Sequence, residues 1–379
     1  MTHSSNGVNF SKSDGLSNND PYLISFGIKP SYFMTDDFLK LRVVRIHAET
    51  SDTKSYFLEP TDGKLVQHRA GQFLTLILLH NGHEVRRSYS LSSATNEPLR
   101  LTIKRIENGE ISRYLLDTVQ VGDVLTSLHP AGRFTLNDNL SGDLVLLGAG
   151  SGITPLFAII KQVLWTEPHR RVTLLYSNTR ERSIIFREEL EELQRQFPDR
   201  FRLINLLSNP SDNWTGLRGR LNNVMLERML PELVGTSDWQ TVQFYVCGPG
   251  DYMRMVQFTV VFSGFRPDQI RRENFVVEPV VLTPLPALAQ DRTVLLKFRG
   301  REVEIQVPAY KSILQAALDE GIQLPYSCRG GRCSTCVARC QSGSVHMTIN
   351  DVLTERDLRE GWVLTCTGYL ESDGVVIEV

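Results

Sequence analysis

Hydrophobic and polar residues alternate in short segments from Phe38 to about residue 136. A period of two is typical of strands that are buried on one face only. Turn residues such as Asn81-Gly82 separate the segments, and a helical stretch that begins near Ser112 interrupts them. We therefore predict an antiparallel β-barrel over residues 34–138. Its strand segments include Leu39–Val44, Ser55–Leu58, Phe73–Leu76 and Leu99–Ile103.

The pattern changes at Asp143, where continuous apolar runs begin to alternate with helical stretches. The run Leu144–Leu147 leads through a glycine-rich turn into a helix predicted over Pro155–Leu164. Alternation of buried strands with helices is typical of a parallel sheet covered by helices. Residues 139–279 are therefore predicted to form an α/β domain. Its further elements are the strands Val172–Tyr176, Phe201–Leu206 and Gln243–Val246 and a helix over Ile184–Gln196.

Residues 291–379 have the pattern of a third, smaller domain. Apolar strands on both sides of Gly300 predict a hairpin. Ser312 is placed to cap a helix over Ile313–Asp319, which Gly321 ends. This order of elements predicts a β-grasp fold, so the chain as a whole is expected to be multidomain.

Two connecting segments differ in composition from these domains. Residues 1–33 are rich in Ser, Asn, Asp and Gly and have no apolar period, which predicts a flexible leader. Residues 280–290 carry Pro284 and Pro286 and are predicted to be an extended linker. A linker of this kind implies that the third domain is tethered and able to move.

The bulk composition excludes several classes of partner. The chain has 379 residues, of which 41% are hydrophobic, and a net charge of −2, which argues against a nucleic-acid partner held by bulk electrostatics. The longest apolar stretch, Leu144–Ile160, is broken by glycines and Pro155, so no membrane span is expected. The first residues lack the pattern of a signal peptide. We therefore expect a soluble, cytoplasmic protein.

Four cysteines carry the most specific chemical signal in the sequence. Four residues separate Cys328 from Cys333, two separate Cys333 from Cys336, and Cys366 follows at a distance. This is the spacing of a plant-type [2Fe–2S] cluster, whose two irons need four thiolates. A structural zinc site usually has two Cys-x-x-Cys pairs, and a disulfide framework belongs to small secreted chains. These four residues are therefore the predicted metal ligands.

The loop between the first two of these cysteines contains Gly330 and Gly331. Glycines allow positive φ values and bring backbone N–H groups close to the sulfurs, where they stabilise the charge of a reduced cluster. The other two cysteines, Cys247 and Cys340, are expected to be buried small hydrophobic residues.

Two further motifs lie where predicted strands end. Arg87-Ser88-Tyr89-Ser90 closes a barrel strand, and Gly148-Ala149-Gly150-Ser151-Gly152-Ile153-Thr154-Pro155 joins a strand to a helix. Glycines in such a turn let the backbone approach a dinucleotide pyrophosphate, although the spacing departs from the G-x-G-x-x-G fingerprint. Taken alone, the first motif is equally well a strand with one exposed arginine.

In this order the motifs resemble those of the ferredoxin–NADP⁺ reductase superfamily. The resemblance implies that Arg87 neutralises a flavin pyrophosphate, that Tyr89 stacks on the isoalloxazine and that Ser90 hydrogen-bonds near N5, where hydride arrives. Ser88 belongs to the same cofactor-binding segment. Tyr89 and Ser90 are therefore expected to be catalytic.

The turn Gly109-Glu110-Ile111-Ser112 resembles the second phosphate-binding turn of that superfamily. Backbone amides at a helix N-terminus favour a pyrophosphate, so Gly109, Ile111 and Ser112 are expected to bind cofactor. The alternative is an ordinary capped start of a helix. This second pyrophosphate contact favours FAD over FMN.

The resemblance assigns the nicotinamide site to the α/β domain. It implies that the glycine-rich turn binds NAD(P)H, and that Cys247, in the turn Cys247-Gly248-Pro249, aligns the hydride path without acting as a nucleophile. Phe275, in Glu273-Asn274-Phe275, either lies near the flavin or packs as an ordinary strand residue. The expected nucleotide-binding residues are Gly148, Gly150, Gly152, Thr154, Cys247, Gly248 and Pro249.

Preference between the two nucleotides depends on the end of the second α/β strand. An acidic residue at that tip would hold the ribose 2′-OH of NADH, whereas an arginine would accept the 2′-phosphate of NADPH. The segment contains Ser177, Arg180 and Arg182 but no acid at its immediate tip, so NADPH is favoured over NADH. The alternative is a solvated loop in which Glu181 pairs with either arginine.

The resemblance covers nearly all of the chain beyond the leader and implies the reductase component of an oxygenase. A nicotinamide gives two electrons as hydride and a cluster takes one at a time, so the flavin connects them. The expected acceptor is an oxygenase of the phenylacetyl-CoA epoxidase type. Alternative acceptors are a Rieske oxygenase or a hybrid-cluster protein. A non-catalytic redox-sensing module is opposed by the intact Arg87, Tyr89 and Ser90.

Overall fold

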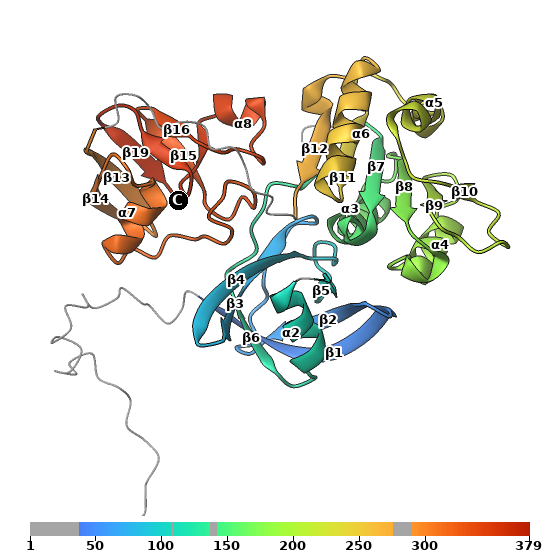
Figure 1. The fold of residues 1–379 in the computed structure, drawn as a ribbon, viewed down its shortest axis with the longest axis horizontal. Coiled ribbons are helices and arrows are strands. Elements are labelled where there is room, and N and C mark those ends of the chain that lie inside the picture. The colour runs from blue at the N-terminus through green and yellow to red at the C-terminus, as the bar shows by residue number, and fades with distance from the viewer. Residues whose placement is uncertain (1–37, 108, 137–141, 276–289) are drawn as a thin grey trace, which may run out of the picture.

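This computed structural model describes residues 38–107, 109–136, 142–275 and 290–379, which form three units, each built on its own sheet (Figure 1). The predicted leader lies outside the described residues, and so does the predicted linker except for its last residue. The predicted multidomain architecture is confirmed. The predicted domain boundaries stay predictions.

The first unit is an antiparallel sheet with the strand order β4-β3-β6-β1-β2-β5. A bridge between Leu91 and Leu101 connects its two edges, so the sheet curls into a barrel. Asn81 and Gly82 have φ values of 51° and 79°, as the predicted Asn-Gly hairpin requires. The elements are β1 (Leu39–Thr50), β2 (Thr53–Pro60), β3 (Phe73–His80), β4 (His83–Ser90), β5 (Leu99–Lys104), α2 (Glu110–Thr118) and β6 (Val124–Ser127).

The second unit is a parallel sheet with the order β10-β9-β8-β7-β11-β12. Its strands are β7 (Leu144–Ala149), β8 (Val172–Asn178), β9 (Phe201–Leu207), β10 (Leu217–Arg218), β11 (Gln243–Cys247) and β12 (Ile270–Glu273). Its helices are α3 (Ile153–Thr166), α4 (Arg187–Gln196), α5 (Asn223–Val234) and α6 (Gly250–Phe262). The single turns η2 (Gly150–Gly152), η3 (Glu181–Ser183) and η4 (Pro267–Gln269) complete it.

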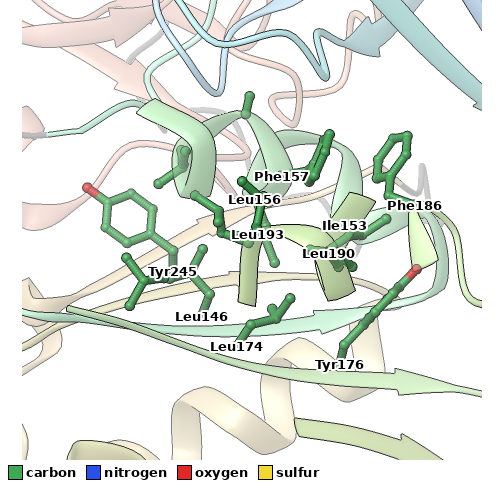
Figure 2. Packing of buried hydrophobic residues seen from close by; sticks show 14 of the residues in the cluster. Leu146, Ile153, Leu156, Phe157, Leu174, Tyr176, Phe186, Leu190, Leu193 and Tyr245 are labelled. Atoms are coloured by element: carbon green, nitrogen blue, oxygen red, sulfur yellow. The ribbon is translucent and has the colours of Figure 1, made fainter. Parts of the chain in front are cut away.

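Alternate residues of the central strands face opposite sides of this sheet. Leu146 and Leu174 pack with helices α3 and α4, as Figure 2 shows, whereas Val145 and Leu147 pack with α5 and α6. Both faces of the sheet are therefore covered, which explains the continuous apolar runs in its strands.

Helix α4 begins later than its apolar pattern predicts. The prediction was Ile184, but the helix starts at Arg187 because Phe186 has a left-handed φ of 59°. The Phe186 ring stacks on Phe157 with ring centroids 4.3 Å apart, so Ile184 and Ile185 are buried without being helical. Tertiary packing sets this boundary.

The third unit is a five-stranded mixed sheet with the order β14-β13-β19-β15-β17, accompanied by a two-stranded sheet, β16-β18. Ser312 caps α7 by accepting a hydrogen bond from the amide of Gln315, and Gly321 has a φ of 81°, as predicted. The strands are β13 (Arg292–Phe298), β14 (Arg301–Val307), β15 (Val337–Ser342), β16 (Val345–Met347), β17 (Trp362–Leu364), β18 (Gly368–Leu370) and β19 (Val375–Glu378). The helices are α7 (Ile313–Asp319) and α8 (Glu355–Arg359).

Within the described residues, none of the helices combines the length and the apolar character that a membrane span requires. The best apolar stretch of the sequence forms strand β7, the glycine turn and part of α3.

A buried guanidinium joins the barrel to the α/β unit. Arg100 on β5 is 5% exposed and donates to both carboxylate oxygens of Glu189 on α4, at 2.9 and 2.8 Å. It also donates to Glu49 on β1 at 2.7 Å, and the Glu49 side chain is only 4% exposed. The Phe186 ring lies 4.6 Å from the guanidinium carbon. Arg100 therefore neutralises two carboxylates at the junction.

We predict that Arg100→Met destabilises the protein by about 3–5 kcal/mol, because it leaves the buried Glu49 carboxylate without its cation. Urea-induced unfolding followed by circular dichroism measures the loss. The matched control is Arg187→Met, which removes an exposed ion pair with Glu191 on α4 and is expected to cost about 0–1 kcal/mol. Equal losses in the two variants would contradict the prediction.

Candidate functional site

One cavity of about 600 Å³ is lined by residues from all three units. The barrel contributes the end of β4 and the turn before α2, the α/β unit contributes the end of β12, and the third unit contributes the cysteine loop. Residues that represent these walls are Ser88, Ser90, Gly109, Glu273, Phe275 and Cys328. Segments that are far apart in the sequence therefore meet at one site.

The motif at the end of β4 lies on this cavity. Arg87, Ser88 and Ser90 line it, and the Arg87 guanidinium, at the exposed rim, donates to the carbonyl of Arg86 at 2.8 Å. The Ser88 hydroxyl lies 3.0 Å from that of Thr75 on β3. Tyr89 packs against the barrel core, and burial raises the pKa of its phenol. Tyr89 is thus the one residue of the motif that does not line the cavity in this structure.

The turn before α2 is tightly closed. A Cβ added to Gly109 would lie 2.7 Å from the Ser112 hydroxyl, so no larger residue fits there. That hydroxyl donates to the carbonyl of Gly109 at 3.1 Å and accepts from the amide of Ile106 at 3.2 Å. The Ile111 side chain is buried in the barrel core. The Gly109 amide also closes the turn by donating to the carbonyl of Ile106 at 2.9 Å, so the amides of the first turn of α2 are the ones placed to meet an anion.

The glycine-rich turn after β7 packs directly on the turn after β11. A Cβ on Gly152 would lie 2.1 Å from the carbonyl oxygen of Cys247, and one on Gly248 would lie 3.0 Å from the Cβ of Ala149. The hydroxyls of Tyr176 and Tyr252 donate to the carbonyls of Gly150 and Gly148, at 2.9 and 3.3 Å. These glycines are therefore required for backbone packing and leave the turn open to a close-fitting ligand.

The other predicted residues of this region follow the same geometry. The Thr154 hydroxyl donates to the carbonyl of Ser151 at 3.0 Å, which closes the first turn of α3. Pro249 immediately precedes α6 and is exposed. Cys247 is fully buried, and burial raises the pKa of its thiol well above the ordinary value. A neutral thiol agrees with the prediction that Cys247 is not a nucleophile.

Glu273 is a candidate functional residue that sequence reasoning missed. It stands at the end of β12 in register with Cys247 on β11, which is itself in register with Gly148 on β7. Its Oε2 accepts a hydrogen bond of 2.9 Å from the Ser90 hydroxyl. Burial raises the pKa of the Glu273 carboxyl to about 8. The Glu273-Asn274-Phe275 segment was noted in the sequence, but only the fold brings its glutamate to the serine.

Phe275 follows two residues later and also lines the cavity, with 40% of its surface exposed. An exposed aromatic ring at a cavity wall is available for stacking on a planar ligand. Its location is compatible with the first of its two predicted alternatives, a place near the flavin.

The tip of β8 presents two arginines to solvent. Arg180 and Arg182 are exposed, and neither has an ion-pair partner within the described part of the chain. One alternative was that Glu181 pairs with one of these arginines, but it pairs with neither. Its Oε1 instead accepts from the amide and the hydroxyl of Ser211, at 2.8 and 2.6 Å. Ser177 comes before the tip of β8, and its hydroxyl lies beside that of Tyr252.

The four predicted ligand cysteines form two pairs. The thiol of Cys333, together with nearby backbone amides, lowers the pKa of Cys328 to about 6, and the thiol of Cys336 lowers the pKa of Cys366. The six cysteines are all free of disulfides. The partner thiols Cys333 and Cys336 have raised pKa values, so each pair shares its protons until a metal displaces them. Two pairs of cysteine sulfurs are the donor set that two bridged irons require.

Backbone amides of the cysteine loop point at the sulfurs, as predicted. The amide of Gly330 lies 3.4 Å from Sγ of Cys328, and the amide of Cys328 lies 3.4 Å from Sγ of Cys333. The amide of Gly331 lowers the pKa of Cys366. Gly331 has a φ of 71°, and a Cβ there would lie 2.5 Å from the carbonyl oxygen of Ile349. The loop therefore fits a [2Fe–2S] cluster in donor type and in amide placement.

The two remaining cysteines differ from each other. Cys247 is buried, as predicted. Cys340 is only partly buried, packs against the hydrophobic core of the third unit and donates its thiol to the carbonyl of Ser342 at 3.2 Å, so the prediction of a buried hydrophobic residue is met there only in part.

Three family models match the chain in the order of its three units. The oxidoreductase FAD-binding domain matches residues 40–136, and the oxidoreductase NAD-binding domain matches residues 146–258. The 2Fe-2S iron-sulfur cluster binding domain matches residues 296–371.

Full-length relatives share the whole arrangement. The ferredoxin reductase component of 3-ketosteroid-9-alpha-monooxygenase from Mycolicibacterium smegmatis is 34% identical, over 91% of this chain and 99% of that protein. The E subunit of 1,2-phenylacetyl-CoA epoxidase from Escherichia coli is 31% identical, over 90% of this chain and 97% of that protein. The structure of phthalate dioxygenase reductase is similar in fold, with a TM-score of 0.56 and 23% identity over 91% of this chain and 99% of that chain.

The chain therefore belongs to the family of oxygenase reductase components that join an FAD-binding, an NAD-binding and a [2Fe–2S] domain. It is an NAD(P)H-dependent oxidoreductase that passes electrons through FAD and the cluster to a protein acceptor. The predictions of FAD, of the cluster and of this reaction are confirmed.

We predict that Glu273→Gln changes the pH dependence of stability. The pKa of Glu273 rises on folding from 4.5 to about 8, so the folded state holds a proton that the unfolded state has lost. Between these values the folded state binds more protons, and its stability must fall as the pH rises. The melting temperature of the holoprotein should therefore fall more steeply from pH 6 to 9 in the wild type than in Glu273→Gln.

The control for this comparison is Glu188→Gln, which replaces an exposed carboxyl on α4. Its melting temperature should follow that of the wild type at every pH. Parallel curves for the wild type and Glu273→Gln would show that Glu273 is ionised in the folded protein, contrary to the prediction.

Proposed function

We propose that the cavity shared by the three units holds the flavin ring between the nicotinamide site and the cluster. The observation that supports this proposal is that Ser90, Glu273 and Cys328 line the same cavity of about 600 Å³ although they belong to three different units. When bound, FAD accepts two electrons together and releases them one at a time. The protein's part is to position both neighbours of the ring and to control protons around it.

On the nicotinamide side, Ser90, Cys247 and Glu273 form the proposed catalytic group. Glu273 keeps a proton at neutral pH because burial raises its pKa to about 8, and it accepts the Ser90 hydroxyl hydrogen bond at 2.9 Å. A proton held there would balance charge on a flavin bound in the cavity. Cys247 fills the space behind them as a neutral thiol and aligns the nucleotide.

On the barrel side, Arg87 and the amides of the Gly109 turn are proposed to bind the pyrophosphate. Arg87 is exposed at the rim of the cavity, where its guanidinium donates to the carbonyl of Arg86. We retain Tyr89, which is only partly buried at the barrel core, as the residue that stacks on the ring. The cavity-lining Phe275 is the second aromatic contact that we propose.

On the acceptor side, Cys328, Cys333, Cys336 and Cys366 are the proposed cluster ligands. Cys328 and Cys333 line the cavity, so they would hold the cluster beside the proposed flavin site. Arg332, between them in the loop, is buried and pairs with Asp351 at 3.1 Å. A fixed cation beside the sulfurs stabilises the additional electron of a reduced cluster.

We propose NADPH as the preferred nucleotide because Arg180 and Arg182 are exposed at the tip of β8 while Glu181 is held by Ser211. The hydrogen bonds from Ser211 occupy Oε1 of Glu181. Arg180 and Arg182 are therefore placed to accept a 2′-phosphate.

We predict that Arg180→Gln and Arg182→Gln each raise the KM for NADPH about tenfold, because one charge-assisted contact with phosphate contributes about 1.5 kcal/mol or more. The KM for NADH should change little, and steady-state kinetics with ferricyanide measures both. The matched control is Arg195→Gln, an exposed arginine at the other end of α4. Equal effects on both nucleotides would contradict the assignment.

We propose that the acceptor is the oxygenase component of a monooxygenase, supported by the 34% identity to a ketosteroid monooxygenase reductase component. An epoxidase of the phenylacetyl-CoA type is the second candidate, on the 31% identity to one of the polypeptides of that enzyme. We also propose a cytoplasmic location, because the free cysteines that load a cluster stay reduced there.

The function is tested by anaerobic titration of the purified holoprotein with NADPH and with NADH, followed by visible absorption. Both the flavin and the iron–sulfur bands should bleach, because the two sites share one cavity. Cys336→Ser should lose the cluster signal in electron paramagnetic resonance yet still show flavin bleaching. Cys340→Ser is the matched control and should keep both signals.

Bleaching of the flavin alone in the wild type would contradict the proposed electron path. Retention of the cluster in Cys336→Ser, or its loss in Cys340→Ser, would contradict the ligand assignment.

A further inference from the structure

The third unit contacts the barrel through side chains around the cavity. The Ser88 hydroxyl donates to that of Ser327 at 3.0 Å, and the Arg86 guanidinium lies 4.0 Å from the centre of the Tyr326 ring. Next to them, Arg133 forms an ion pair with Asp357. The cluster loop is therefore held on the cavity by polar contacts, which can open without exposing a large apolar surface.

Arg133, a residue of the barrel, contacts both of the other units. Its guanidinium pairs with Asp357 at the start of α8 and lies 4.3 Å from the centre of the Trp362 ring on β17. Its main-chain carbonyl accepts a hydrogen bond of 3.4 Å from Arg271 on β12. One residue of the barrel thus touches both other units, and helix α8 lies on the side of the third unit that faces them (Figure 1).

Hydrogen bonds within the third unit orient Asp357 for this contact. Its Oδ2 accepts hydrogen bonds from the amide and the hydroxyl of Thr354, at 2.9 and 2.8 Å, which leaves Oδ1 for Arg133. The Asp357 side chain is 11% exposed and that of Arg133 is 28% exposed. An ion pair that is partly buried and fixed on one side contributes more than an ordinary surface pair.

The cluster loop faces the cavity in this arrangement. Cys328 and Cys333 line the cavity wall together with Ser327, so this side of the loop is turned toward the flavin site. An external protein cannot use the same side of the loop at the same time. The third unit must therefore leave this position for any acceptor that approaches through Cys328 and Cys333.

We propose that Arg133 is a positioning residue: its ion pair with Asp357 holds the cluster loop on the flavin cavity and opens when the third unit moves to its acceptor. This inference rests on the proposed function, because it assumes that the cavity holds the flavin. The electrostatic contact makes docking reversible and sensitive to salt.

The test compares Arg133→Gln, Arg133→Lys and the wild type as holoproteins. Small-angle X-ray scattering measures how far the third unit is from the other two, without any turnover. Stopped-flow absorption after mixing with NADPH measures the lag between flavin bleaching and cluster bleaching. The matched control is Arg105→Gln, which removes the ion pair with Asp117 inside the barrel and leaves the junction intact.

The expected result is a larger radius of gyration and a lag about tenfold longer in Arg133→Gln, as loss of ~1.4 kcal/mol of docking free energy implies. Arg133→Lys should lie between the two. High salt should move the wild type toward the Arg133→Gln values, because screening weakens the pair, but should change Arg133→Gln little.

The proposal is overturned if Arg133→Gln has the radius and the lag of Arg105→Gln, or if salt has no effect on the wild type. If Arg133→Gln fails to retain FAD, Asp357→Asn replaces it, because asparagine keeps an acceptor for Thr354, and the same results are expected. Absence of cluster bleaching in the wild type would refute the proposed function instead. The scattering comparison tests the ion pair in either case.

Discussion

Electrons cross a protein quickly only over short distances, so each unit of this chain must bring one edge to the same cavity. The barrel supplies Ser88 and Ser90, the parallel sheet supplies Glu273, and the cysteine loop supplies Cys328. This requirement explains several local features together. Glycines stand where the turns after β7 and β11 meet, and buried or partly buried charges join the units, as at Arg100 and Glu189.

Charge is distributed unevenly around that cavity. The whole chain has a net charge of −2, yet six arginines line the cavity beside the two carboxylates of Glu273 and Asp357. A positive interior suits anionic cofactors and a site that receives electrons. Burial raises the pKa of the Glu273 carboxyl to about 8, so this acid adds little negative charge to the cavity at neutral pH. The site thus gains a proton donor without losing its positive character.

The sequence predicted the features that depend on local spacing. The four cysteines lie close together in the sequence or at the end of the same small domain, and the Asn81-Gly82 turn and the Ser312 cap need only neighbouring residues. Contacts between distant residues could not be read in this way. Ser90 and Glu273 are 183 positions apart, and Arg133 and Asp357 are 224 apart, so only the fold reveals them. The start of α4 was mispredicted because ring stacking at Phe186 overrides its apolar period.

The order of strands in the third unit has a consequence for biosynthesis. Strand β19 (Val375–Glu378) lies at the centre of its sheet, between β13 and β15, and it is translated after every other described strand of that sheet. The sheets of the other two units are complete once Glu273 has been made, so both can fold while the ribosome is still translating the third. The third unit cannot close until residues 375–378 have emerged. The sheet of the cluster-binding unit is therefore the last of the three to become complete during synthesis.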